Sequence, residues 1–382
     1  MNTGFPTRPS YASQRERFLG AATAAGARLT EYIHPLSGPF GEPLATDVAL
    51  LGDPHAKKVL VMLSGTHGVE GFYGSNCQIK WLQTFTDREL PSDVALLVIH
   101  LINPWGTAWM RRVNEDNIDL NRNYLDFSNA LPDNLQYEGL HEIYTCTQLL
   151  GPKRDQADAL LDERTRAEGW STIKSIVEAG QYNHSDGLFY GGQSPSWSNK
   201  TLHTIIQEHL THAQVAMCFD LHTGAGDYGH PMLMTIAKSA YPQLNDAQAL
   251  YGPWLYTLIT GAGSKSGTGV AATATGYTSQ AIIDALPNVY LMPFVIECGT
   301  YPGEQIHTFL RNDQWLHLHG DLTDEVARKI KLELLEQFYP ADADWQELVW
   351  LRTRQIWERA LTALPQILSL ANQPPQSIHS AT

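Results

Sequence analysis

Two histidines and two glutamates have the types and spacing of a hydrolytic metal site: His67, Glu70, His222 and Glu297. Two imidazoles and one carboxylate, with a fourth position left for water, form the usual ligand set of catalytic zinc. His67 and Glu70 are three residues apart, so one turn can supply two ligands while His222 supplies the third. Zinc acidifies water and polarises a carbonyl oxygen. A separate carboxylate must then carry the proton to the leaving group, and Glu297 fits that role.

Three apolar segments that read as buried strands end beside these residues: 57–63 before the turn with His67, 215–221 before His222, and 290–296 before Glu297. The carboxyl ends of parallel strands line the ligand crevice of open α/β sheets, so we expect the three ends to converge if the strands are neighbours. A glutamate that ends an apolar strand is desolvated, which raises its pKa. Asp220 precedes His222 by two residues, faces the same side of the sheet, and can orient that ligand.

The polar segment 103–123 adds groups that can bind a carboxylate or stabilise an oxyanion. It contains the Arg111-Arg112 doublet, and Asn121 followed by Arg122. An arginine fork grips a carboxylate with two hydrogen bonds, and a second arginine can stabilise the negative oxygen that forms when water adds to an amide. Taken alone, the segment reads better as a polar loop whose Asn and Asp side chains cap turns and whose arginines pair with nearby acids.

The composition is that of a globular protein and restricts its partners. The 382 residues are 43% hydrophobic and carry a formal net charge of −14, with no basic run of the kind that binds nucleic acid. Residues 1–20 lack the hydrophobic stretch of a signal peptide, and no run of 18 apolar residues could cross a membrane. We therefore expect a cytoplasmic protein that binds neither nucleic acid nor membrane.

The order of the segments predicts one α/β domain over residues 1–382. A strand, a glycine-rich turn, a helix and a second strand follow one another over residues 57–100, which predicts a parallel crossover. Residues 135–199 read as an insertion of helices and loop, and residues 321–368 as two C-terminal helices. The glycine-rich segment 261–269 lacks the Gly-Lys-Ser/Thr sequence of a phosphate loop and reads as a mobile loop near the site.

The motifs HGVE, NPWG…RR…NIDLNRN, DLHTG and IECGTYPG, in that order, resemble the zinc carboxypeptidase-like superfamily. That group includes the metallocarboxypeptidases and the succinylglutamate desuccinylase/aspartoacylase branch. The DLHTG form and the stretch GLFYGGQSPSWSN resemble a bacterial branch whose members are mostly of unassigned function. The resemblance covers about residues 57–303. It implies a mixed, mostly parallel eight-stranded sheet sandwiched between helices, and one zinc ion on His67, Glu70 and His222.

The same resemblance implies a role for four further residues. Glu297 would be the general base, and Arg112 would polarise the scissile carbonyl, with Arg111 the less favoured member of the doublet. Asn121 and Arg122 would bind the free carboxylate of a small-molecule or peptide substrate.

Two features depart from the family pattern. The stretch between Glu70 and His222 is longer than in the ordinary carboxypeptidases, mainly through residues 135–199, so the insertion is expected to reshape or cover the pocket. The substrate-closing tyrosine of the family matches either Tyr277 or Tyr301.

The sequence therefore predicts a zinc amidohydrolase, either a carboxypeptidase or a deacylase that acts on an N-acyl amino acid. A small closed cavity favours the deacylase, and an open cleft favours a peptide substrate. The alternative is a catalytically silent metal- or ligand-binding protein of the same fold, against which the retention of Glu297 argues. For His184, His230 and His307 a structural role is favoured over a place in the pocket.

Overall fold

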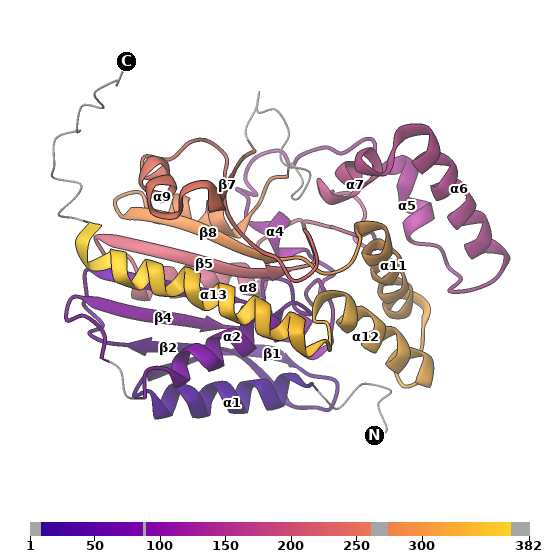
Figure 1. Cartoon of the computed structure of the whole chain (residues 1–382). Coiled ribbons are helices and arrows are strands. Elements are labelled where there is room, and N and C mark those ends of the chain that lie inside the picture. The colour runs from indigo at the N-terminus through magenta and orange to yellow at the C-terminus, as the bar shows by residue number, and fades with distance from the viewer. Residues whose placement is uncertain (1–8, 87–88, 261–273, 368–382) are drawn as a thin grey trace, which may run out of the picture.

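The structure is a computed structural model that describes residues 9–86, 89–260 and 274–367 (Figure 1). The predicted glycine-rich loop at 261–269 lies outside these residues. The strands are β1 (Arg28–Ser37), β2 (Pro43–Leu51), β3 (Lys58–Ser64), β4 (Val94–His100), β5 (Val215–Thr223), β6 (Pro231–Ala237), β7 (Leu255–Ile259) and β8 (Tyr290–Cys298). The helices are α1 (Tyr11–Ala24), α2 (Gly71–Gln83), α3 (Pro104–Ala108), α4 (Leu120–Asn123), α5 (Glu138–Tyr144), α6 (Pro152–Glu168), α7 (Trp170–Glu178), α8 (Trp197–His209), α9 (Leu244–Tyr251), η1 (Gly252–Trp254), α10 (Thr278–Ala285), α11 (Gly303–His319), α12 (Glu325–Phe338), α13 (Ala343–Ala363) and η2 (Leu364–Gln366).

The strands form one mixed sheet in the order β1-β2-β4-β3-β5-β8-β6-β7. The central strands β4, β3, β5 and β8 are parallel to one another, as are β6 and β7. The pairs β1–β2, β2–β4 and β6–β8 are antiparallel. The predicted fold class, a mixed and mostly parallel eight-stranded sheet, is confirmed. The strand that follows β3 in the sequence, β4, lies on one side of it, and β5 lies on the other side. The direction of strand addition therefore changes between β3 and β5. At such a switch point, α/β sheets open a crevice at the carboxyl ends of their strands.

Helices cover both faces of the sheet, which explains why its central strands are apolar throughout (Figure 1). Side chains alternate along a strand, so β3 contributes to two separate cores. Leu60 and Met62 pack in the core that includes α1, α2 and α13. Val59 and Val61 pack in the opposite core, which includes α8 and α10. This two-sided burial holds the ends of β3, β5 and β8 at fixed positions.

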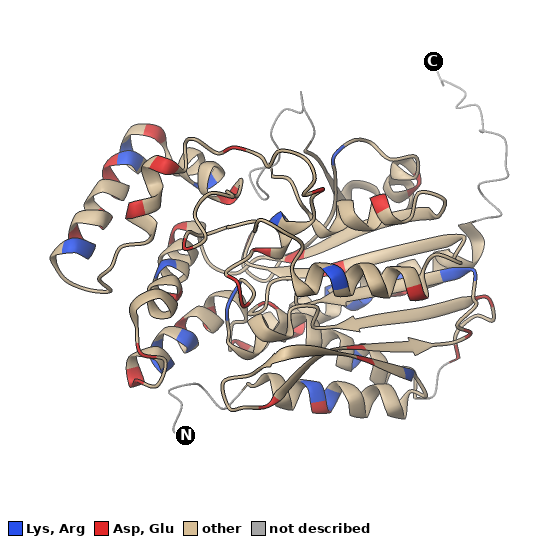
Figure 2. Cartoon of the chain, turned by 180° about the vertical axis from the view of Figure 1, so that it is seen from behind, with Lys and Arg blue, Asp and Glu red and all other residues tan. Residues whose placement is uncertain are grey.

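The segment 135–199 lies beside one end of the sheet, where α5, α6 and α7 stand next to α11 (Figure 1). The helix α6 begins at Pro152, directly after Gly151, and proline is suited to the first helical position. Figure 2 shows acidic and basic residues interspersed along α6, whose sequence is PKRDQADALLDERTRAE. Within the described residues, no helix combines the length and the apolar character needed to cross a bilayer.

Several elements differ from the sequence-based expectation. The segment 103–123, expected to be a loop, contains the short helices α3 and α4. At the end of the segment 135–199, the helix α8 begins at Trp197, where the Ser196 side chain accepts a hydrogen bond from the Asn199 amide and caps the helix. The strand β7 and the helix α11 were not predicted. β7 lies at the edge of the sheet and is only partly buried, so it lacks the continuous apolar signal of the central strands.

Candidate metal centre

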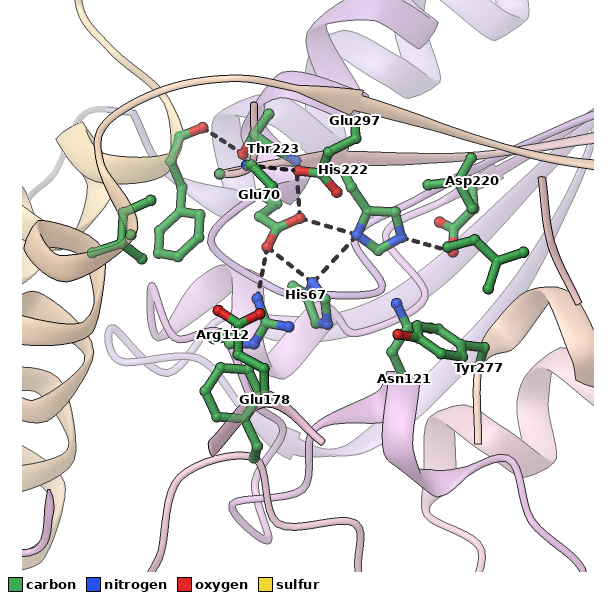
Figure 3. A pocket seen from close by; sticks show the side chains of 18 of the residues that line it. His67, Glu70, Arg112, Asn121, Glu178, Asp220, His222, Thr223, Tyr277 and Glu297 are labelled. Atoms are coloured by element: carbon green, nitrogen blue, oxygen red, sulfur yellow. Dashed lines mark hydrogen bonds and ion pairs between the residues drawn. The ribbon is translucent and has the colours of Figure 1, made fainter. Parts of the chain in front are cut away.

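The carboxyl ends of β3, β5 and β8 bring the predicted site residues together (Figure 3). The turn after β3 carries His67 and Glu70, and Glu70 directly precedes α2. His222 lies near the end of β5, and Glu297 near the end of β8. His222 and Glu297 are register partners in the parallel pair β5–β8, so their side chains share one face of the sheet. The predicted convergence of the three strand ends is present in the fold.

The turn after β3 requires glycine at two positions. Gly65 has a φ of +74°, a conformation that residues with a side chain seldom adopt. A Cβ atom on Gly68 would lie 2.0 Å from the backbone carbon of Gly106. The Gly68 amide donates to the Arg112 carbonyl at 3.1 Å, which fastens the turn to the segment that carries the arginine doublet.

His67, Glu70 and His222 face one another at ligand-to-ligand distances. The His67 Nδ1 atom lies 2.9 Å from Glu70 Oε1, and His222 Nδ1 lies 3.1 Å from Glu70 Oε2. The two Nδ1 atoms are 3.3 Å apart. All three side chains are buried, so solvent does not separate them. Two imidazoles and a carboxylate in this arrangement form a donor set that fits Zn²⁺.

A carboxylate engages the far side of each imidazole. His67 Nε2 lies 3.1 Å from Asp119 Oδ1, and His222 Nε2 lies 2.9 Å from Asp220 Oδ2. Such outer carboxylates fix the orientation of a metal-binding histidine and leave its other nitrogen for the metal. Asp220 therefore lies where an orienting residue was expected. Asp119 was not predicted to have this role, although it lies within the NIDLNRN motif.

The electrostatics of the cluster favour a bound cation. Burial acts to lower the pKa of His222, but the carboxylates of Asp220 and Glu70 outweigh burial and hold that pKa well above its ordinary value. Burial likewise acts to raise the pKa of Glu70, but the two histidines outweigh it and lower that pKa. The carboxylates around His222 therefore stabilise positive charge on its ring, and a metal ion can take the place of that proton.

Glu297 lies beside this cluster without joining it. Its Oε1 atom accepts a hydrogen bond from the Ala225 amide at 3.1 Å. Burial, reinforced by the negative charge of Glu70, raises the pKa of Glu297 to about 8. The sequence-based expectation that a glutamate at the end of an apolar strand has a raised pKa agrees with this environment.

The structure distinguishes the two arginines of the doublet. Arg112 faces the cluster, with Nη1 at 3.2 Å from Glu70 Oε1 and Nε at 3.0 Å from Asp119 Oδ2. Arg111 points the other way, where its Nε donates to Asp313 at 2.9 Å. Only Arg112 therefore reaches the site.

Asn121 and Arg122, on α4, also line the cavity. The Asn121 side-chain oxygen accepts hydrogen bonds from the amide and hydroxyl of Thr278. The Arg122 guanidinium donates to the backbone carbonyl of Glu178 and lies 5.2 Å from the centre of the Tyr277 ring. Both side chains are thus held in place before any substrate arrives.

Of the two tyrosines considered from the sequence, Tyr277 lines the cavity. The Tyr301 hydroxyl instead donates to Glu336 at 2.6 Å, and this residue is not part of the cavity lining. The position of Tyr277 next to Arg122 makes it the better match to a residue that closes over a substrate.

The cavity has a volume of about 110 Å³ and extends from the cluster toward the insertion. Lys174 and Glu178 of α7 and His307 of α11 line its far wall, together with Phe189. Glu178 Oε1 lies 3.1 Å from His307 Nε2. Burial acts to raise the pKa of Glu178, but His307 and the nearby cations outweigh it and lower that pKa.

The residues of this far wall were missed in the sequence. Lys174 and Glu178 sit in an ordinary helical pattern that carries no signal of a site. A structural role was favoured for His307, which lines the cavity, whereas His184 and His230 are absent from its lining.

The chain belongs to the DUF2817 family, described as a protein of unknown function, whose model matches residues 8–352. A comparison with curated proteins gives no match. Among solved structures, the chain is similar to bovine thrombin-activatable fibrinolysis inhibitor in complex with tick carboxypeptidase inhibitor (13% identity, TM-score 0.47, 94% of this chain and 97% of that one).

Two further solved structures are similar to the chain at comparable identity. The chain is similar to the carboxypeptidase A from Helicoverpa armigera (12% identity, TM-score 0.44, 90% of this chain and 74% of that one). It is also similar to a succinylglutamate desuccinylase from a Silicibacter species (14% identity, TM-score 0.38, 78% and 68%).

Proposed function

We propose that this protein is a zinc-dependent hydrolase that cleaves an amide bond next to a carboxylate-bearing residue. One observation carries the proposal. The Nδ1 atoms of His67 and His222 lie 3.3 Å apart, and each lies beside one oxygen of the buried Glu70 carboxylate. His67, Glu70 and His222 would hold one zinc ion. When bound, zinc supplies a Lewis acid that acidifies water and polarises the scissile carbonyl.

The residues around the cluster supply the remaining steps. Glu297 takes the proton of the attacking water on its carboxylate and passes it to the leaving nitrogen, because it lines the cavity beside the cluster and is not one of the three candidate ligands. Its raised pKa suits a group that must both accept and donate a proton. Arg112 stabilises the negative charge that develops on the carbonyl oxygen. Its contacts with Glu70 and Asp119 hold it in position.

Asn121 and Arg122 would bind the free carboxylate of the substrate, with Tyr277 closing over it. The Arg122 guanidinium lines the cavity and is held by the backbone carbonyls of Glu178 and Asn121, and the two N–H groups that these contacts leave over would bind the carboxylate. The cavity is small, which favours an N-acyl amino acid over a peptide as the substrate. We further propose that residues 1–382 form one domain, in which the insertion at 135–199 supplies part of the cavity wall through α7.

The direct test is turnover by zinc-loaded protein on a panel of N-acyl amino acids and dipeptides, with the C-terminal amide of each compound as a control. We expect hydrolysis of at least one compound with a free carboxylate and much slower hydrolysis of its amide. Stoichiometric zinc with no turnover on any compound would instead support the alternative, a catalytically silent metal-binding protein.

A further inference from the structure

A second cluster of metal-binding side chains lies outside the cavity, where α5 meets the loop that follows α7. His141 Nε2 lies 2.8 Å from Asp186 Oδ1. His184 Nε2 lies 2.9 Å from Glu138 Oε2. The two imidazole rings stack, with centres 3.8 Å apart and planes inclined by 22°. Donor atoms of His141, His184 and Asp186 all lie within 4.8 Å of one another, which is within reach of a shared ion after small side-chain movements.

Two short segments of the chain supply these four side chains. Glu138 and His141 are three residues apart on α5, so their side chains project from the same face of the helix. His184 and Asp186 are two residues apart in the loop, and the turn between them is closed by a hydrogen bond from the Gly187 amide to the His184 carbonyl. Two short sequence segments thus supply two donors each, a pairing that transition-metal sites commonly use.

We propose that His141, His184 and Asp186, with Glu138 as a fourth donor, form a second site for a divalent transition metal such as Zn²⁺. Imidazole and carboxylate donors suit these ions, whereas Ca²⁺ and Mg²⁺ prefer oxygen donors alone. If both histidines formed ion pairs with their carboxylates, two positive rings would stack at 3.8 Å and repel each other. One metal ion bound by two neutral imidazoles satisfies the same carboxylates without that repulsion.

The exposure of the cluster gives an ion access from solvent. The His141 side chain is 18% exposed, that of His184 is 24% exposed and that of Asp186 is 48% exposed. The cluster therefore needs no opening of the fold to bind an ion, and water can complete the coordination shell.

Such an ion would fasten the insertion to the wall of the cavity. The loop that carries His184 and Asp186 is held by the Asn117 side chain, which donates to the carbonyls of Ser185 and Gly187 at 2.9 Å each. Two residues beyond Gly187, the Phe189 ring packs under Arg112, with 4.9 Å between the ring centre and the guanidinium carbon. The second site would therefore stabilise the segment that supports this arginine, whether or not the protein is an amidohydrolase.

The test counts metal ions and needs no substrate. The full chain is stripped with a chelator and titrated with Zn²⁺ by calorimetry, with Co²⁺ absorption as an independent readout of ligand geometry. We expect two Zn²⁺ ions per wild-type chain, one in the His141→Ala/His184→Ala variant, and one in the His67→Ala/His222→Ala variant. Asp186→Asn should lower the affinity for the second Zn²⁺ ion at least about 10-fold. Zn²⁺ should also raise the melting temperature of the His67→Ala/His222→Ala variant, in which only the second site remains. His319→Ala, at an exposed histidine of α11, is the matched control and should retain both ions.

Circular dichroism of each variant checks the fold. If a double variant does not fold, the number of Zn²⁺ ions bound per wild-type chain still reports whether the chain binds a second ion. A folded His67→Ala/His222→Ala variant that binds no Zn²⁺, or a Zn²⁺ count that is unchanged from wild type in a folded His141→Ala/His184→Ala variant, would overturn the proposal. In either case each histidine would form only the hydrogen bond with its own carboxylate, His141 with Asp186 and His184 with Glu138. Loss of the second ion alone would leave the proposed function untouched, because the two double variants report the two sites separately.

Discussion

His222 and Glu297 occupy opposite positions in the parallel pair β5–β8, one as a candidate metal ligand and the other as a candidate base. Neighbouring strands lie about 4.8 Å apart, so this register sets the separation of the two groups through backbone hydrogen bonds. Neither side chain can move far without disturbing the centre of the sheet. The proposed chemistry therefore rests on the central strands of the sheet.

Glu297→Gln should abolish most turnover while leaving the metal bound. The substitution removes the proton carrier but keeps the size of the side chain, and Glu297 is not one of the three residues that converge on the metal position. We expect kcat to fall by at least about 100-fold, the usual contribution of a general base. Turnover with zinc content measured on the same sample checks this. A variant with near-normal kcat would show that Glu297 is not the base.

The same substitution should change how the stability of the metal-free protein depends on pH. The pKa of Glu297 is about 8 in the fold against an ordinary value of 4.5. Between these values the folded protein keeps a proton that the unfolded chain has lost, so the free energy of unfolding falls as pH rises through this window. That contribution is fully present below the ordinary pKa and is absent from Glu297→Gln.

We therefore expect the metal-free variant to gain stability relative to wild type as pH rises from about 5 to about 8, by at most about 1.4 kcal/mol per pH unit. Urea unfolding of chelator-treated wild type and variant at several pH values measures the difference. Parallel stability curves for the two proteins would contradict the raised pKa.

Replacing the two arginines of the doublet should have different consequences. Arg112→Met should lower kcat/KM at least about 100-fold with zinc still bound, because it removes the donor proposed for the developing oxyanion. Arg111→Met should leave the kcat/KM of the folded protein close to wild type, because Arg111 contacts Asp313 away from the cavity. Breaking that buried pair should instead cost about 3 kcal/mol of stability. Kinetics and urea unfolding of both variants check this, and equal loss of activity in both would contradict the assignment.

Arg122→Met should weaken the binding of substrates with a free carboxylate and leave the binding of amidated substrates almost unchanged. A hydrogen bond to a charged group contributes about 1.5–3 kcal/mol, so KM should rise about 10- to 100-fold for the acids. Comparing each acid with its amide separates loss of recognition from general damage to the site. The assignment of Arg122 as the carboxylate-binding residue fails if the substitution raises KM for the acids and for their amides by the same factor.

The sequence by itself determined the local parts of the site. The spacing of His67 and Glu70, and the position of His222 and Glu297 at the ends of apolar strands, are properties of short segments. The order of strands and helices predicted an α/β sheet, and the family resemblance implied its eight mixed strands. The burial of β3, β5 and β8 on both faces leaves a continuous apolar run, which is why these strands were visible without coordinates.

Only the tertiary structure decided which distant groups share the cavity. It showed that Arg112 rather than Arg111, and Tyr277 rather than Tyr301, lines the cavity. Which residue faces the cavity depends on backbone contacts between distant segments, such as the hydrogen bond from the Gly68 amide to the Arg112 carbonyl. It also placed Glu178 and Lys174 on the cavity wall, although their helix carries no local signal of a site. The periodicity of a helix reports which of its faces is buried, but the partner of that face is set by the packing of the whole chain.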